Sequence, residues 1–138
     1  MKVGRASSFV EFTRNDWEET GDYWLTVSVE KDGFTGVVGE VWLSPDNVNN
    51  FIRDLALLER DRTENAKLEN YVSEPESGPL DFEIRKIDSF GHLGVFVTLR
   101  RVISLRRAPE LLTLNVCFEL DREFLAPAIN NFKKLFSL

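Results

Sequence analysis

Apolar and polar residues alternate along most of the chain, and at two places the apolar spacing lengthens to three and four residues. Alternation is typical of strands with one buried face, whereas a spacing of three and four is typical of an amphipathic helix. Strands are therefore expected within residues 7–15, 22–30, 34–44, 66–73, 80–88, 91–102 and 110–121. Because the helical segments follow the third and the seventh strand, the element order is βββα-ββββ-α.

Residues 22–44 predict a β-hairpin whose two alternating runs meet at Lys31-Asp32-Gly33. A two-residue Asp-Gly turn would set Leu25 opposite Glu40 and mix polar and apolar residues on both faces. We therefore prefer a three-residue loop, which sets Leu25 opposite Gly39. This register assigns to the core face Tyr23, Leu25, Val27, Val29, Val37, Val41 and Leu43, and to the other face Trp24, Thr26, Ser28, Val38, Glu40 and Trp42.

Two amphipathic helices are expected. The first follows Ser44, Pro45 and Asp46, a hydroxyl cap, a proline for the first turn and a carboxylate that the helix dipole favours. Its apolar stripe consists of Val48, Phe51, Ile52, Leu55 and Leu58. The second helix spans residues 126–136, because Pro127 belongs in a first turn, and Asp121 would cap a turn before it.

An offset of 77 residues aligns the apolar positions of the two helical segments, from Ser44 against Asp121 onward. The alignment indicates either an internal duplication or no relationship at all, because any two amphipathic helices can be aligned once one is shifted along the other. We predict an α+β domain, a mainly antiparallel sheet of about seven strands with both helices packed on one side. Its expected core contains Leu25, Val27, Val41, Phe51, Ile52, Leu55, Leu114, Val116, Phe118 and Ile129; the last strand also points Leu112 inward.

Composition limits the class of protein. A length of 138 residues fits one domain, residues 1–138, and the N-terminus lacks the apolar run of a signal peptide, so a cytoplasmic protein is expected. No segment approaches the ~20 apolar residues that cross a bilayer, and we expect no membrane partner. The net charge of −6 argues against nucleic-acid binding. Residues 1–83 hold 18 acidic and 8 basic side chains, a balance of −10, whereas residues 84–138 are net positive.

Candidate catalytic and metal-binding chemistry is sparse. His92 is the single histidine and is expected in a turn or on the surface, and the single cysteine, Cys117, is expected to be a small buried residue. No glycine-rich phosphate loop precedes a helix. We therefore expect no catalytic residue, no metal and no cofactor.

Two groups of residues are candidates for partner binding. The first is an acidic loop built from Asp16, Trp17, Glu18, Glu19 and Asp22, which lacks the ligand spacing of a calcium loop. The second is aromatic, because Trp24, Trp42 and Phe96 all lie opposite the predicted core face. These aromatic residues form either an exposed interaction patch or, if the sheet curls, a second small core.

The segments "DYWLTVSVE", "FTGVVGEVWLSPDNVNNFIRDLALLE", "GHLGVFVTLRR" and "LTLNVCFELDREFLAPAINNFKKL" together resemble a family of small bacterial proteins of unknown function related to the WapI-type immunity proteins. Members are encoded beside large secreted polymorphic toxins, and the WapI-type toxin ends in a tRNA-cleaving domain that its immunity protein binds and blocks. The resemblance implies a non-enzymatic inhibitor of a cognate toxin domain, and the family has no catalytic residues to carry over.

Two other functions stay open at this point. One is a ligand-binding or enzymatic domain with a cavity between sheet and helices, where the acidic loop and His92 would lie at the rim. The other is a homodimeric module that associates through Trp24 and Trp42.

Overall fold

The computed structural model describes residues 1–15, 21–70, 78–104 and 109–138. The first half of the element order is β1 (Lys2–Arg5), β2 (Ser8–Arg14), β3 (Tyr23–Lys31), β4 (Phe34–Leu43) and α1 (Pro45–Glu59). The second half is β5 (Asn65–Glu69), β6 (Leu80–Lys86), β7 (Leu93–Ser104), β8 (Pro109–Leu120), a 3₁₀ turn η1 (Arg122–Phe124) and α2 (Leu125–Leu135). The described residues thus contain eight strands in the order ββββα-ββββα.

The strands form two antiparallel four-stranded sheets, with the orders β1-β2-β3-β4 and β5-β6-β7-β8. The prediction of one sheet with about seven strands is therefore wrong in the number of strands and of sheets. The additional strand is β1, whose four residues include Gly4 and which pairs with β2 from Arg5 opposite Ser8. A strand this short carries too few alternating positions for its pattern to be recognised.

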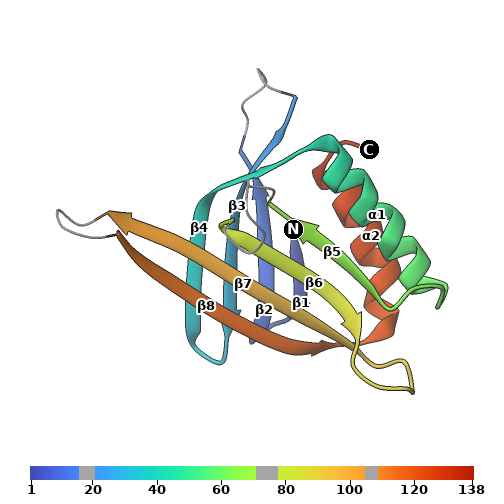
Figure 1. Ribbon diagram of the computed structural model, residues 1–138. Coiled ribbons are helices and arrows are strands. Elements are labelled where there is room, and N and C mark those ends of the chain that lie inside the picture. The colour runs from blue at the N-terminus through green and yellow to red at the C-terminus, as the bar shows by residue number, and fades with distance from the viewer. Residues whose placement is uncertain (16–20, 71–77, 105–108) are drawn as a thin grey trace.

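The two sheets cross at a large angle, and the two helices lie side by side at one end of them (Figure 1). Four phenylalanines meet where these layers join: Phe12 of β2, Phe51 of α1, Phe82 of β6 and Phe132 of α2. The ring centroid of Phe132 lies 5.3 Å from that of Phe12 and 5.0 Å from that of Phe51, and both pairs have edge-to-face geometry. The centre of the core is thus shared between both sheets and both helices, whereas the prediction packed both helices on one sheet.

The predicted core positions are mostly confirmed. The buried members of the predicted set are Leu25, Val27, Val41, Phe51, Ile52, Leu55, Val116 and Ile129. Leu114 and Phe118 are half-buried at its margin, because β8 is an edge strand of the second sheet.

Helix α1 begins as its sequence predicts. The Ser44 hydroxyl oxygen accepts a hydrogen bond of 3.2 Å from the backbone N–H of Asn47, and Pro45 opens the helix. All five residues of the predicted apolar stripe are buried. Helix α2 starts one residue earlier than predicted, at Leu125, directly after η1. Asp121 precedes η1 as expected, but its carboxylate accepts a hydrogen bond from the Arg5 guanidinium and none from a backbone N–H of η1.

The turn between β3 and β4 contains two residues, so the three-residue loop is wrong. Lys31 pairs with Phe34, and Asp32 and Gly33 have φ values of 49° and 88°. Two successive residues with positive φ are the hallmark of the type I′ turn that an Asp-Gly pair favours. The apolar pattern disfavours this turn only if the β3–β4 register is uninterrupted.

A β-bulge in β4 resolves the conflict between the turn and the apolar pattern. Val27 pairs with Val38 and Leu25 pairs with Val41, so β4 holds one additional residue between these pairs. A bulge changes which face the following residues occupy. Val38, predicted on the outer face, is therefore buried, and Val37, predicted in the core, is 58% exposed.

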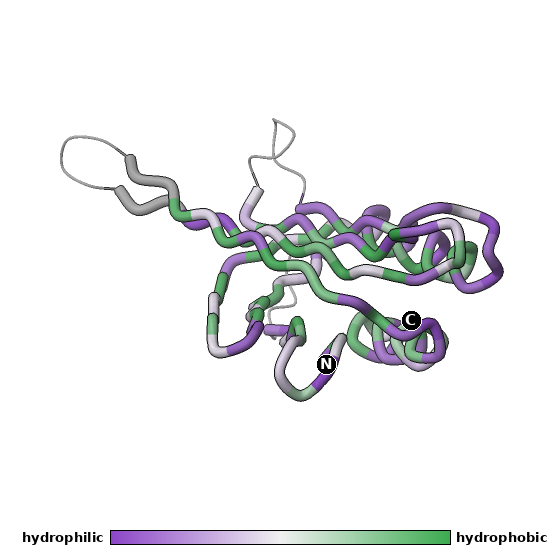
Figure 2. Tube along the Cα trace, turned by 90° about the horizontal axis from the view of Figure 1, so that it is seen from below, coloured by the Kyte–Doolittle hydropathy of each residue, from purple (hydrophilic) through white to green (hydrophobic). Residues whose placement is uncertain are grey.

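Strands β7 and β8 extend past the end of β6. Leu80, the first residue of β6, pairs with Leu99, and β7 and β8 continue together to the Ser104↔Pro109 pair. We call residues 100–104 and 109–113 the arm; this end of the hairpin projects beyond β4, away from the helices (Figure 1). Figure 2 shows hydrophobic and hydrophilic residues alternating along the strands of the body. Leu112 lies in the arm and is exposed, which corrects its predicted inward position.

Candidate functional site

The acidic loop can be followed only in part, because Asp16, Trp17, Glu18 and Glu19 lie outside the described residues. Asp22 is described and is exposed immediately before β3. Its participation in partner binding stays a prediction.

The two predicted aromatic residues of the first sheet lie against each other on its outer face. Trp24 pairs with Trp42 across β3 and β4, and their rings stack with centroids 5.3 Å apart and an interplanar angle of 5°. The indole N–H of Trp24 donates a hydrogen bond of 3.0 Å to the carbonyl oxygen of Gly39 in the bulge. This pair stabilises the strand ends beside the bulge and leaves both rings partly exposed.

Phe96 does not join that pair. It lies on β7 in the second sheet, on the face opposite its core neighbours Val95 and Val97, and the guanidinium of Arg85 lies 3.9 Å from its ring centroid. Because the inner faces of the two sheets share one core, the two outer faces point away from each other. The structure therefore forms neither the single aromatic patch nor the second core that the sequence suggested. Cys117, the register partner of Phe96, is exposed on the same outer face, which corrects its predicted burial.

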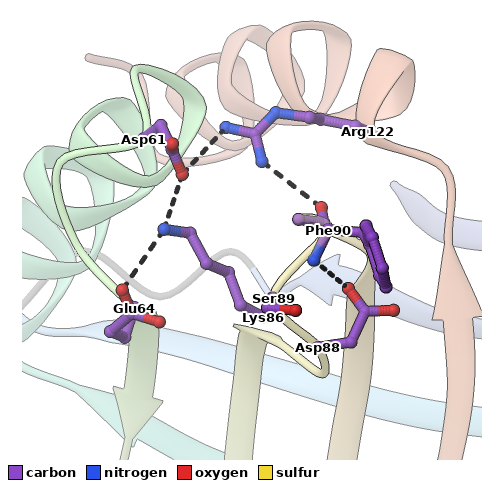
Figure 3. A pocket seen from close by; sticks show the side chains of 8 residues that line it. Asp61, Glu64, Lys86, Asp88, Ser89, Phe90 and Arg122 are labelled. Carbon is purple, nitrogen blue, oxygen red and sulfur yellow. Dashed lines mark hydrogen bonds and ion pairs between the residues drawn. The ribbon is translucent and has the colours of Figure 1, made fainter.

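A polar pocket of about 440 Å³ lies where α1, the β6–β7 connection and η1 meet (Figure 3). The Lys86 side chain is 14% exposed and central to the pocket, and its ammonium lies 2.5 Å from the carboxylate of Asp61 and 3.3 Å from that of Glu64. Arg122 lies 3.7 Å from the same Asp61 carboxylate. The carboxylates and cations lining the pocket thus largely neutralise one another.

Arg122 also holds the end of α1. Its guanidinium donates hydrogen bonds of 3.1 and 3.2 Å to the carbonyl oxygens of Leu58 and Glu59, and one of 3.4 Å to that of Gly91. A cation at a helix C-terminus satisfies free carbonyl groups and interacts favourably with the helix dipole. Arg122 therefore joins the second half of the chain to the helix of the first.

The protonation states in this pocket follow from the pairing. A hydrogen bond from Lys86 holds the pKa of Asp61 below its usual range, and the same bond raises the pKa of Lys86. Both shifts favour the charged forms, the opposite of what a lysine nucleophile or a carboxylic general acid requires. The geometry supports a structural ion-pair network rather than a reaction centre.

His92 lies at the surface, as predicted, beside this pocket. Its ring Nδ1 is hydrogen-bonded to the carboxylate of Asp88, which also accepts from the backbone N–H groups of Phe90 and His92. The hydrogen bond with Asp88, followed by the charge of that carboxylate, raises the pKa of His92. Phe90 is 87% exposed in the same connection. Within the described ranges, no group of three or more His, Cys, Asp or Glu side chains is placed to hold a metal ion.

Sequence reasoning missed a groove of about 600 Å³ between β4 and the arm. It is lined by Val37, Val38, Gly39 and Glu40 of β4 and by Arg101 of β7. The contributing segments lie about 60 residues apart in the chain, and neither carries a recognisable motif. The glycine beside Glu40 in an otherwise regular strand was the one local signal, because such a glycine often marks a bulge.

Taken together, these features define a small α+β domain with partly exposed aromatic residues, a groove at a sheet edge and a neutralised polar pocket. Residues 3–138 match the model of the immunity protein WapI-like family, and the chain belongs to that family. It matches none of the curated proteins and none of the solved structures. Across the described residues, no helix is long and apolar enough to cross a membrane.

Proposed function

We propose that this protein is an immunity protein that binds a cognate toxin domain and occludes its active surface. The observation that carries the proposal is the family match, which spans nearly the whole chain. Immunity by occlusion needs a stable surface and no chemistry. The paired charges around Lys86 and Asp61 agree with that requirement, because they favour a structural role for the pocket that these residues line.

We further propose that the toxin domain is a nuclease with a basic active surface. The support is electrostatic: the chain has a net charge of −6, and the acidic excess lies in residues 1–83. A surface that binds phosphate groups is basic, and an acidic inhibitor would approach it with steered, salt-sensitive association.

Co-expression tests the proposal directly. The C-terminal domain of a toxin encoded beside this gene is induced in cells with and without the protein, and growth is followed. We expect growth arrest without the protein and full growth with it, and a one-to-one complex of the purified components in light scattering. Equal growth arrest in both strains, with no complex, would refute the immunity function.

Light scattering of the protein alone tests the homodimer that the two tryptophans first suggested. A monomeric mass for the free protein is the expected result, since Trp24 and Trp42 already stack on each other within one chain.

A further inference from the structure

Strand β4 is an open edge of the first sheet. It is last in the order β1-β2-β3-β4 and pairs with β3 alone. In the part of the chain that the structure describes, no backbone hydrogen bond joins β4 to a further strand on its other side. An edge strand presents unpaired N–H and C=O groups that can pair with another chain.

The β7–β8 hairpin crosses β4 at the base of the arm. A Cβ atom on Gly36 of β4 would lie 2.4 Å from the Cδ2 atom of Leu114, so β8 lies directly over β4 at that point. Beyond it, no third strand among the described residues pairs with the hairpin, because β6 begins at the Leu80↔Leu99 pair. An isolated two-stranded ribbon is at best marginally stable in water, so a surface that packs against the arm would stabilise it.

The groove between β4 and the arm has room for another backbone. A Cβ atom on Gly39 would meet nothing within 4 Å, so the chain is open to solvent where β4 bulges. A glycine within a strand often marks a close approach of a second backbone. Val37 is 58% exposed in the groove, and Leu112, the register partner of Arg101, is 54% exposed on the arm.

The groove also carries one charge of each sign, Glu40 on β4 and Arg101 on the arm. A second copy of this protein would fit it poorly, because Glu40 is the single charged residue in β4. A paired copy of β4 would therefore bring a second carboxylate rather than a cation, between two molecules that each carry a net charge of −6. A basic side chain on a partner strand would instead pair with the exposed Glu40 carboxylate.

We propose that the toxin domain adds an extended strand to the free edge of β4, beneath the arm. Main-chain hydrogen bonds would supply affinity, and alternate side chains of the added strand would supply specificity. The chemistry of the groove calls for an apolar side chain against Val37 and a basic one near Glu40. The inference deepens the proposed immunity function and rests on it, because the occupant is the toxin domain.

A lysine at the edge tests the strand addition. Val37→Lys places a charge where the added strand would lie, and edge lysines are a natural guard against strand pairing. The matched control is Thr13→Lys, on an exposed position of β2, an inner strand of the same sheet. Binding of the purified C-terminal domain of the neighbouring toxin is measured by titration calorimetry. We expect the dissociation constant to rise at least tenfold for V37K and to stay within twofold for T13K.

A second pair of variants tests the charge requirement. Glu40→Lys reverses the acidic group in the groove, and Glu59→Lys makes the same change at the exposed C-terminal end of α1. We expect weaker binding for E40K and unchanged binding for E59K. Circular dichroism and thermal melting of all four variants should match the wild type, because each altered side chain is exposed.

Amide hydrogen exchange separates strand addition from contact through side chains. In the complex, amides of residues 34–40 should exchange more slowly, whereas those of β5, an edge strand of the second sheet, should be unchanged. If the toxin binds the wild type but V37K binds equally well and residues 34–40 are unprotected, the inference is overturned and the immunity function stands. If the wild type does not bind the toxin, both fail. A third outcome is that the free protein self-associates, that V37K abolishes this self-association, and that V37K still binds the toxin. That result would show that the β4 edge binds a second copy, and it would also overturn the inference.

Discussion

Removing the aromatic ring of Phe132 should test how strongly the two halves of the chain depend on each other. Phe132 is fully buried in α2 and packs edge-to-face on Phe12 and Phe51, both from the first half. It also lies 6.1 Å from Phe82, measured between ring centroids. The substitution Phe132→Ala therefore removes contacts to both sheets and to α1 at once.

The size of the effect follows from this packing. A buried Phe→Ala change typically costs about 3–5 kcal/mol, and each well-placed aromatic pair contributes roughly 0.5–1.5 kcal/mol beyond its buried area. With two edge-to-face partners, we expect a loss near the upper end, about 4–5 kcal/mol. A 138-residue domain has a total stability of roughly 7–20 kcal/mol at ordinary values per residue. The variant should therefore fold in water and unfold much more readily.

Urea unfolding provides the measurement, followed by both tryptophan fluorescence and far-UV circular dichroism. At an m-value of about 2 kcal/mol/M, the midpoint should fall by roughly 2 M. Phe34→Ala is the control, because Phe34 is 74% exposed, and its stability should change by no more than about 0.5 kcal/mol. A loss below about 2 kcal/mol for F132A would show that the site relaxes around the missing ring, and would refute the shared-core interpretation.

Three further predictions concern local contacts. Asp88→Asn should return the raised pKa of His92 toward about 6.5, and NMR of the single histidine measures that pKa. In the wild type, the stabilisation from protonated His92 is fully present below the pKa that His92 has in the unfolded chain. It is lost as the pH rises through the pKa of His92 in the folded protein. Ser44→Ala should cost about 1 kcal/mol in urea unfolding through the lost helix cap. Gly4→Ala should cost at least about 2 kcal/mol, because φ is +125° there and its Cβ would lie 2.2 Å from a carbonyl oxygen of β2.

For Asp88, whose pKa is lowered by the same contact, the stabilisation is present above its unfolded value and is lost as pH falls through the folded one. A pKa of His92 that does not change in D88N would contradict the pairing. Gly39→Ala is the control for Gly4, since a Cβ there meets nothing, and equal stability of both alanine variants would contradict the steric argument.

The sequence predicts most reliably the elements whose signals are local. Helix α1 could be placed from Ser44 to Leu58, because a cap and a three-and-four stripe lie within fifteen residues and act on one another directly. The type I′ turn was equally local, and Asp32-Gly33 signals it on its own. It was misjudged because the bulge lies several residues away and restores the apolar pattern.

The candidate site was less predictable, because its parts come from distant segments. Nothing near Glu40 in the sequence indicates that Arg101 lies across a groove from it. Similarly, the charged residues of the polar pocket come from three distant segments, at Asp61, Lys86 and Arg122. In the sequence, none of them differs from an ordinary surface charge. The faces of Trp24 and Phe96 were assigned correctly by alternation, but alternation does not tell whether two strands belong to one sheet.

The four-phenylalanine cluster has a consequence for any fragment of this protein. Residues 1–62 supply Phe12 and Phe51, and residues 63–138 supply Phe82 and Phe132, so a chain cut between α1 and β5 leaves each fragment with half of the cluster. Neither fragment alone can bury its two phenylalanine rings against the two rings of the other fragment. The guanidinium of Arg122 would also lose the carbonyl groups at the end of α1 to which it donates hydrogen bonds. Mixed together, the fragments should assemble as obligate partners, which makes this domain suited to a split reporter whose signal appears only when both pieces meet.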